Sequence, residues 1–467
     1  MKRLWPVLVV VVMAGAAGAA SPKLRSSDGK GGPTFTENVA PIVYDKCVTC
    51  HRPGQAAPFA LITYADVQKK GKQIAKVTAA RYMPPWHAAH GFGEFADERR
   101  LSDDEIATIG TWVGNGMPEG DPKKLPALPT FPDGWHLGTP DLVLKMPASF
   151  DVPASGPDVY RNFVIPTGVL EDKWIRAIEF HPSARKAVHH VLFAYDATGG
   201  AAKMDGRDGK PGFGGMGSAG VGGLSGGTGP LGGWAVGATP QFLPSGVALS
   251  LPKGSDVILQ MHFHPTGKAE TEQSTVGIYF ADRAPERRLY SLQVPALFGF
   301  GSNIDIPAGQ KEFAIEDTMT LPVDVRVYSI AAHAHYIAKS MKAQATLPDG
   351  TTQPLLWIPD WDFAWQDRYT YKTPVVLPKG TRIDSRLVYD NSDDNPHNPA
   401  TPAKRVQWGE QSFDEMGSVI LAVQAVNKED EPALQQAIVA RTRGAIARAQ
   451  ANGTLRRLME QRGRGGQ

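Results

Sequence analysis

The sequence predicts a multidomain protein in which a small all-α domain is followed by all-β sandwiches. With 467 residues the chain is long enough for two or three ordinary domains. Its shares of 42% hydrophobic and 21% charged residues are those of a folded globular protein. Residues 33–125 have helical patterning, whereas short alternating apolar runs follow one another beyond that point. This change of pattern sets the main domain boundary.

The helical region contains three predicted helices. The first begins near Thr36 and leads into the sequence CVTCH, and the second covers residues 64–80. The third covers residues 106–113. It follows Ser102, which has Glu105 three positions later, and this is the pattern of a capping box.

The β region begins after a proline-rich boundary, PALPTFPDGW. Its alternating runs are separated by Gly, Pro and Asp at regular spacing, which is typical of antiparallel β-sandwiches. The glycine-rich segment 198–237 predicts a long surface loop. The tail 428–467 is rich in Ala, Arg and Gln from Glu431 onward, which predicts a helix that ends in a disordered RGRGGQ.

The N-terminus has the pattern of a secretory signal peptide over residues 1–20. Lys2 and Arg3 precede an apolar run that ends in the small residues 18–20, and a polar, glycine-rich linker follows at 21–32. A retained membrane anchor would need about 20 apolar residues, and this run is shorter. We therefore expect a periplasmic or secreted protein with no transmembrane segment in the mature chain. The net charge of +2 gives no reason to expect a nucleic-acid partner.

The pentapeptide Cys47-Val48-Thr49-Cys50-His51 is the pattern of covalent haem attachment in an exported protein. The chain has only these two cysteines, so a disulfide scaffold is excluded. A thioredoxin-like pair is the alternative, but it gives no role to His51 and no βαβ pattern surrounds it. We expect one haem c with His51 as an axial ligand, and residues 33–125 resemble a class I-like cytochrome c domain.

The second axial ligand is predicted to be Met83, in the sequence RYMPPWH. Its two prolines hold an extended arm ahead of the last helix, and a thioether opposite histidine suits an electron carrier. Met83 could instead only pack against its surroundings, and Met117, His87 and His90 are the rival ligands.

Three histidine motifs and one methionine are candidates for metal ligation in the β region. His333 and His335 face the same side of a strand because they are two residues apart. Adjacent residues face opposite sides, so a joint role for His189 and His190 requires a bulge or a strand end. Imidazole suits copper, zinc, iron and nickel, and an added thioether favours Cu(I). Each motif alone is weak evidence; the full set is His189-His190, His262-Phe263-His264, His333-Ala334-His335 and Met416.

Taken together and in this order, the motifs resemble those of the copper type II, ascorbate-dependent monooxygenases, the family of peptidylglycine α-hydroxylating monooxygenase and dopamine β-monooxygenase. The resemblance covers residues 135–427 and implies two tandem jelly-roll sandwiches, 135–285 and 286–427, with one copper ion each. It implies an electron-transfer copper held by His189, His190 and His262, and an oxygen-binding copper held by His333, His335 and Met416.

Several positions depart from the family pattern. The disulfides of the animal enzymes are absent, and Ala331, Ser418 and Ile420 replace the arginine, asparagine and tyrosine of the peptide-binding site. Peptide amidation is therefore not expected. His264 is an additional histidine that could be a spare ligand or, as we favour, an outer residue. Two further histidines, His181 and His397, belong to no motif and are predicted to be structural.

The favoured function is a haem- and copper-dependent monooxygenase that hydroxylates a C–H bond of a small substrate with O2. Because haem and copper both exchange single electrons, we expect the fused cytochrome to supply the copper sites, with a redox partner protein or a small reductant as donor. One alternative is a non-catalytic electron-transfer or copper-binding cytochrome. Another is a cytochrome joined to a β-sandwich binding module whose histidines bind nothing.

Overall fold

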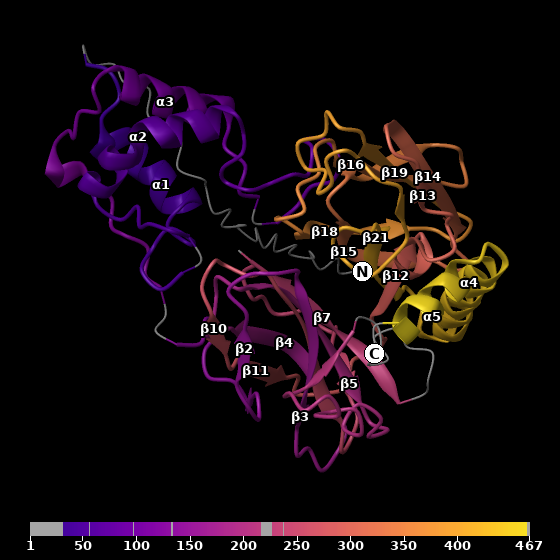
Figure 1. Cartoon of the computed structure of the whole chain (residues 1–467). Helices are drawn as coiled ribbons and strands as arrows, with labels where there is room; N and C mark the ends of the chain where they lie inside the picture. The colour runs from indigo at the N-terminus through magenta and orange to yellow at the C-terminus, as the bar shows by residue number, and fades with distance from the viewer. Residues whose placement is uncertain are drawn as a thin grey trace, which may run out of the picture.

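The computed structural model describes residues 31–55, 57–96, 98–131, 134–215, 227–236 and 238–464, and the predicted signal peptide lies outside them. Helices gather near the N-terminus, antiparallel sheets form the rest, and two helices follow the last strand (Figure 1). The predicted β-sandwich class is therefore confirmed. No helix within the described ranges has the length and apolarity needed to cross a membrane.

The N-terminal helices begin where side-chain caps are available. Ser102 accepts from the backbone amide of Glu105 and the Glu105 carboxylate accepts from that of Ser102, so the predicted capping box is confirmed. Thr63 and Asp66 make the same reciprocal pair at the preceding helix. Each such cap stabilises a helix by about 1 kcal/mol. The elements are the π-helical turn η1 (Phe35–Val39) and helices α1 (Ala40–Lys46), α2 (Tyr64–Ala79) and α3 (Asp103–Gly114).

The first sandwich packs a four-stranded sheet, in the order β1-β11-β4-β8, against a five-stranded sheet, in the order β6-β3-β9-β5-β7. Ile175 and Ile278 of the first sheet share one apolar core with Val191 and Leu259 of the second. Strands β2 and β10 pair separately as a short two-stranded ribbon. The strands are β1 (Leu142–Lys145), β2 (Phe150–Val152), β3 (Val159–Pro166), β4 (Lys173–His181), β5 (Val188–Asp196), β6 (Phe213–Gly214), β7 (Thr228–Ala235), β8 (Leu249–Leu251), β9 (Asp256–Phe263), β10 (Glu270–Glu272) and β11 (Thr275–Phe280).

The second sandwich packs two four-stranded sheets, in the orders β12-β21-β15-β18 and β14-β19-β16-β17. Ile330 and Leu421 of one sheet share a core with Met341 and Leu387 of the other. Short strands β13 (Asp305–Ile306) and β20 (Val406–Gln407) pair separately. The remaining strands are β12 (Tyr290–Val294), β14 (Gln310–Thr320), β15 (Val325–Ala334), β16 (Ala338–Thr346), β17 (Thr352–Ile358), β18 (Arg368–Leu377), β19 (Arg382–Asn391) and β21 (Gly417–Ala425).

The glycine-rich segment is more regular than a surface loop. Its second part forms strand β7, which pairs with β5 along its length, so the loop prediction is wrong there. The glycines allow close packing: a Cβ on Gly229 would lie 2.6 Å from the Tyr195 ring, and one on Gly233 would lie 2.9 Å from the Val191 carbonyl oxygen. The glycines of β7 are therefore needed because this strand packs closely against β5, and they do not indicate an open turn.

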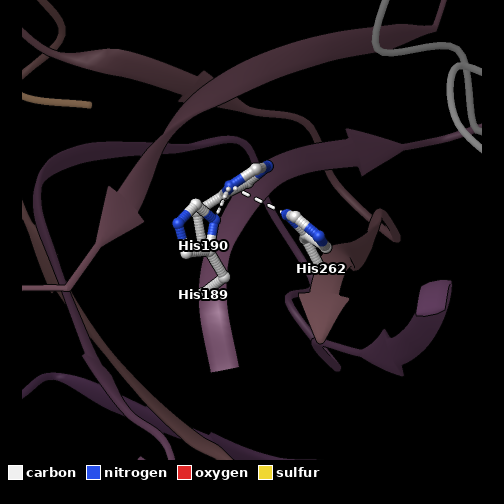
Figure 2. Close-up of side chains that lie close together, drawn as sticks. All are labelled: His189, His190 and His262. Atoms are coloured by element: carbon white, nitrogen blue, oxygen red, sulfur yellow. Dashed lines mark hydrogen bonds between the residues drawn. The ribbon is translucent and has the colours of Figure 1, made fainter. Parts of the chain in front are cut away.

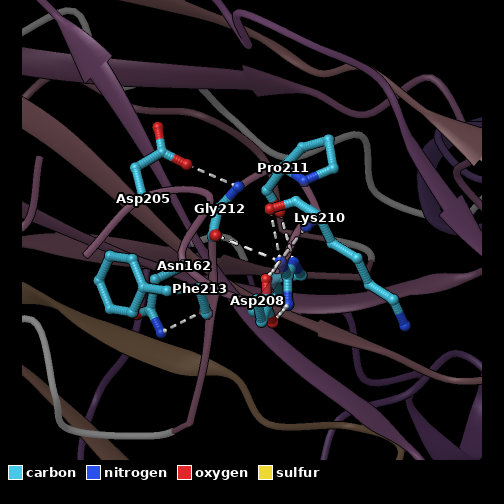
Figure 3. Close-up of polar contacts among 8 residues, drawn as sticks. Asn162, Asp205, Asp208, Lys210, Pro211, Gly212 and Phe213 are labelled. Carbon is cyan, nitrogen blue, oxygen red and sulfur yellow. Dashed lines mark hydrogen bonds and ion pairs between the residues drawn. The ribbon is translucent and has the colours of Figure 1, made fainter. Parts of the chain in front are cut away.

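The first part of the same segment is anchored on a buried arginine (Figure 3). The Arg161 guanidinium donates to both Asp208 carboxylate oxygens at 2.8 Å and to the Lys210 carbonyl at 2.8 Å. Asp205 accepts from the backbone amide of Gly212 at 2.8 Å. Desolvation of Arg161 is thereby offset by a charge-assisted, bidentate pair.

Two helices, α4 (Glu431–Ala451) and α5 (Thr454–Arg464), form the described part of the tail, so the helical prediction is confirmed. Helix α4 lies directly on the second sandwich: a Cβ on Gly301 would lie 2.3 Å from the Ala445 carbonyl oxygen. Arg441 donates to the carbonyls of Gln293 and Thr318. The prediction of a disordered end is wrong for residues 462–464, because they belong to α5, and residues 465–467 lie outside the described ranges.

The chain after α2 crosses to the second sandwich and pairs with it. Phe95 forms an antiparallel bridge with Tyr371 of β18, and the Ala96 amide donates to the Thr370 carbonyl at 2.7 Å. The Ala89 amide donates to the Trp357 carbonyl, also at 2.7 Å. Phe95 is buried in the core of the second sandwich. The helical segment is thus fixed to this sandwich by backbone pairing as well as by covalent connection.

Glu179 of β4 holds the segment at residues 136–137, which leads into the first sandwich, by hydrogen bonds. Its buried carboxylate accepts from the amides of His136 and Leu137 and from His181 at 2.8 Å. The ring of His181 stacks on Trp135, in keeping with a structural role. Burial alone would raise the pKa of Glu179, but these hydrogen bonds outweigh it and lower the pKa.

The variant Glu179→Gln is therefore expected to unfold more easily at neutral pH, by about 1–3 kcal/mol. A lowered folded-state pKa gives stability above the unfolded pKa of about 4.3 that is lost as pH falls through the folded value. The difference between variant and parent should accordingly shrink below pH ~4. Urea unfolding at several pH values measures it, with the exposed Glu171→Gln as control. A constant difference at all pH values would contradict this role.

Candidate metal centres

The first candidate centre joins two neighbouring strands, β5 and β9 (Figure 2). His190 lies opposite His262, and the register shifts between Val188 and His190. This irregularity lets adjacent residues turn toward one point, as the sequence requires for a joint role of His189 and His190. The Nδ1 atom of His190 lies 3.0 Å from Nδ1 of His189 and 3.4 Å from Nδ1 of His262. Three imidazoles therefore converge through their Nδ1 atoms.

These imidazoles are held neutral by burial. Desolvation lowers the pKa of His189 to about 3 and lowers the pKa values of His190 and His262 as well. Neutral imidazole is the form that ligates metals, and three such nitrogens within 4.8 Å of one another fit a single d-block cation. The residues present therefore fit the predicted metal.

Asp158, which no sequence motif marks, orients this centre. Its carboxylate accepts from Nε2 of His262 at 2.7 Å, which leaves the His262 Nδ1 lone pair free for a metal. It also accepts from Nδ1 of His264 at 2.8 Å and from the Ser412 hydroxyl at 2.7 Å. His264 is thus an outer residue that contacts Asp158. Burial alone would raise the pKa of Asp158, but its hydrogen bonds from His262, Ser412 and His264 outweigh burial and lower the pKa.

The variant Asp158→Asn is expected to weaken metal binding at the first centre by about 10- to 100-fold, as loss of an outer carboxylate partner usually does. The His262 Nε2–H would lose its charged acceptor, so the ring would no longer be fixed in one orientation. Competition with a coloured chelator measures the affinity, and the exposed Asp151→Asn is the matched control. Unchanged affinity in Asp158→Asn would show that the carboxylate does not position His262.

The second candidate centre lies at the end of β15 and the start of β21. Ala334 pairs with Gly417, so His335 and Met416 are the next residues of the same register. The rings of His333 and His335 have centroids 5.3 Å apart. Nδ1 of His333 donates to the Gln366 side-chain oxygen at 2.6 Å, and Nδ1 of His335 donates to the Asp414 carbonyl at 3.2 Å. Both rings thus keep Nε2 free for a metal.

Burial governs the charges of this centre too. Desolvation lowers the pKa of His333 to about 4 and holds that of His335 well below its ordinary value. It raises the pKa of Glu415 to about 8. One Glu415 oxygen accepts from the amides of His335 and Met416, at 2.5 and 2.9 Å. Glu415 therefore fixes the two chain segments that carry the ligands to each other.

A single phenylalanine lies between the two centres. The Phe363 ring stacks on His189 with centroids 5.0 Å apart, and it lies 6.1 Å from His262 and 6.0 Å from His335. Phe363 belongs to the loop 359–367, between β17 and β18, which also carries Gln366. No local pattern marks Phe363, because the three histidines that it contacts lie far from it in the chain.

The CxxCH segment forms a turn after α1. The His51 amide donates to the Cys47 carbonyl at 2.9 Å, and Nδ1 of His51 donates to the Phe59 carbonyl at 3.1 Å, which leaves Nε2 free. Both cysteines are free thiols and partly accessible, yet desolvation raises the pKa of Cys47 to about 12. The two thiols and the free Nε2 of His51 fit a covalently attached haem with histidine as an axial ligand.

The predicted distal ligand and its rivals occupy different surroundings. Met83 follows α2, and its amide donates to the Val77 carbonyl at 3.2 Å. Met117 packs between α2 and α3, where a Cβ on Gly71 would lie 2.5 Å from its sulfur. His90 is exposed, and His87 has a buried Nε2 with no partner. Met83 remains a prediction.

Comparison with known proteins assigns no family to the chain. No protein-family model matches it, and no curated protein is similar to it. Among solved structures, the major capsid protein P2 from bacteriophage PM2 is similar over 57% of this chain and 97% of its own, with 11% identity and a TM-score of 0.22. PNGF-II is similar over 61% of this chain and 65% of its own, with 9% identity and the same TM-score. Such low TM-scores carry no argument about function.

Proposed function

We propose that this chain is an exported copper monooxygenase, similar to the type II ascorbate-dependent enzymes, with a c-type haem attached to the same chain. The observation that carries this proposal is the pairing of two unlike centres on opposite sides of Phe363. One centre offers three imidazole Nδ1 atoms, and the other offers two imidazole Nε2 atoms beside Met416. The two ligand sets differ, and only the second includes a thioether, which favours Cu(I). The two centres are therefore suited to different roles in the proposed reaction.

Copper at these centres supplies one-electron chemistry and the activation of O2. The residues of the chain orient the ligands and exclude water. Asp158 fixes the ring of His262, and Gln366 fixes that of His333. Glu415 holds the backbone on both sides of the second centre. The sandwiches are proposed to be the two jelly rolls, 135–285 and 286–427, that the resemblance implies.

The helical segment 33–125 is proposed to be a cytochrome c domain that supplies electrons to the copper sites. The ring of His51 is fixed by the Phe59 carbonyl, which leaves Nε2 free to ligate the haem iron. Because haem and copper both exchange single electrons, no two-electron cofactor is needed between them. The electrons come from a redox partner protein or a small reductant outside the cell membrane.

The substrate is proposed to be a small molecule and not a peptide that is amidated. Ala331, at the position of the family's arginine, pairs with Ile420 of β21 on one side and with Arg368 of β18 on the other. Ser418 is buried, and its hydroxyl donates to the Pro295 carbonyl, so it is already used. The residues that bind a peptide in the related enzymes are therefore replaced at this face.

Metal analysis of the haem-containing protein tests this function directly. We expect two copper ions per haem and two distinct Cu(II) signals in electron paramagnetic resonance. Substrate screening under ¹⁸O2 should place one labelled oxygen atom in a product. Copper below one ion per chain would contradict the monooxygenase and leave a cytochrome joined to a β-sandwich binding module.

A non-catalytic electron-transfer protein is the second candidate. Phe363 lies near the ligands of both centres, and the residues of the peptide-binding site are replaced, which favours a chain that keeps copper without turnover. This function predicts two bound copper ions and slow O2 consumption that does not depend on added substrate. An ¹⁸O-labelled product would exclude it.

A further inference from the structure

Ser412 of the second sandwich contacts the surroundings of the first centre. It belongs to the segment 408–416, between β20 and β21, which ends at the proposed ligand Met416. Its side chain is almost fully buried, and its hydroxyl donates to the Asp158 carboxylate of the first sandwich at 2.7 Å. One side chain of the second sandwich is therefore hydrogen-bonded to the carboxylate that orients His262.

The same hydroxyl also holds a tyrosine. Because an ionised carboxylate only accepts, the Ser412 hydrogen is used toward Asp158, and the Ser412 oxygen accepts from the Tyr160 hydroxyl at 2.9 Å. Tyr160 lies opposite His262 in the pairing of β3 with β9, and the two rings stack with centroids 4.3 Å apart. His262 is thus restrained at its edge by Asp158 and on its face by Tyr160. Ser412 is hydrogen-bonded to both restraining groups.

The segment that carries Ser412 is also held by bonds that do not involve its hydroxyl. The Asp414 amide donates to the Gln411 carbonyl at 2.9 Å. The Asp414 carbonyl accepts from Nδ1 of His335 at 3.2 Å, so two residues separate a contact to the first centre from a contact to the second. Removal of the Ser412 hydroxyl should therefore leave the second centre in place.

We propose that Ser412 and Tyr160 are positioning residues of the first centre, which act on His262 through its hydrogen-bond partner and through its ring face. The inference rests on the proposed metal-binding function of that centre and deepens it. The first sandwich supplies the three imidazoles, and the second sandwich completes their fixed arrangement. Because outer partners that orient a ligand strengthen metal binding, the affinity of the first centre depends on contact between the two sandwiches.

The test uses Cu(II) and the full chain, with competition by a coloured chelator and electron paramagnetic resonance as readouts. Ser412→Ala should weaken binding at the first centre about 3- to 10-fold and shift its Cu(II) signal. This loss is smaller than that expected for Asp158→Asn, because the carboxylate keeps its bond from His262. Ser412→Thr keeps a hydroxyl and should restore most of the affinity. The signal of the second centre should stay unchanged.

Two further single variants separate the hydroxyl network from packing. Tyr160→Phe removes the donor to Ser412 but keeps the ring on His262, so affinity at the first centre should fall about two- to fivefold. The matched control is Ser385→Ala, which removes another buried serine hydroxyl of the second sandwich. This hydroxyl donates to the Asp317 carbonyl between β19 and β14, strands that carry no proposed ligand. The control should change neither the affinity nor the signal.

A double variant shows whether the serine acts through the carboxylate. Effects of residues that share one hydrogen-bond network are not additive. Ser412→Ala combined with Asp158→Asn should therefore lose much less affinity than the product of the two single effects. The value should lie close to that of Asp158→Asn alone.

Three results would overturn the positioning role. The first is an unchanged affinity and signal in Ser412→Ala, and the second is a double variant whose loss equals the full product. The third is an equal loss at both centres, because a bond that only holds the sandwiches together would weaken both alike. In each case the parent protein still binds two copper ions, and the proposed function stands. A parent protein that binds no copper contradicts the proposed function and this inference together.

Discussion

The variant His335→Ala is expected to lose the copper ion of the second centre and to retain that of the first. Its imidazole is almost fully buried, with Nδ1 bound to the Asp414 carbonyl and Nε2 free, so its removal leaves His333 and Met416 as the remaining proposed ligands. We expect hydroxylation to fall by more than about 100-fold, since even outer residues of metal sites contribute 10- to 100-fold. Copper per chain and the loss of one paramagnetic signal measure the effect.

The matched control is His397→Ala, in which the same substitution is made at an exposed histidine outside both centres. It should keep two copper ions and full activity. If His335→Ala also kept two ions, the second centre would have to be built from other residues. If it lost both ions, the two centres would not be independent, and the separate assignment of ligands would be wrong.

The variant Cys50→Ser is expected to prevent normal covalent haem attachment while both copper ions remain bound. The turn from Cys47 to His51 follows α1, whereas the proposed copper ligands lie on β5 and β9 and at the junction of β15 with β21. Turnover supported by a protein electron donor should fall by more than about 100-fold, because the donor would lose its entry point. Turnover supported by ascorbate should fall much less.

Rapid mixing of the reduced parent protein with O2 and substrate shows whether the haem supplies electrons during turnover. The haem absorbance should change to the ferric form within one turnover. Haem that stays reduced while product forms would contradict electron supply by the cytochrome. The companion variant Met83→Leu should keep covalent haem but lose the far-red absorption band of thioether-ligated ferric haem, which tests the distal ligand separately.

Local patterns in the sequence predicted much of the fold and part of the candidate site. The Ser102 capping box, the alternating strands and the helical tail are all short-range signals, and the structure contains them. The pair His189-His190 was informative because adjacent residues in a regular strand diverge, so a joint role required the irregular register that β5 shows against β9. This requirement for an irregular strand follows from the adjacency of His189 and His190 in the sequence.

The remaining parts of the site depend on contacts between distant segments. Asp158 precedes His262 by 104 positions, and Phe363 reaches His189 from the other sandwich. No periodicity or motif connects such residues. Strand β7 was missed for a different reason, since its glycines resemble a loop in composition but serve close packing against β5.

The strand-like pairing of residues 94–96 with β18 has a consequence for how a donor must approach. A cytochrome that swings on a flexible tether delivers electrons at a rate limited by diffusion, so thickening the solvent slows it. Here Phe95 is buried in the sandwich core and its neighbours share backbone hydrogen bonds with Thr370 and Lys372. Internal electron supply should therefore be unaffected by glycerol or sucrose, and an external carrier must dock onto a rigid assembly instead of a mobile arm.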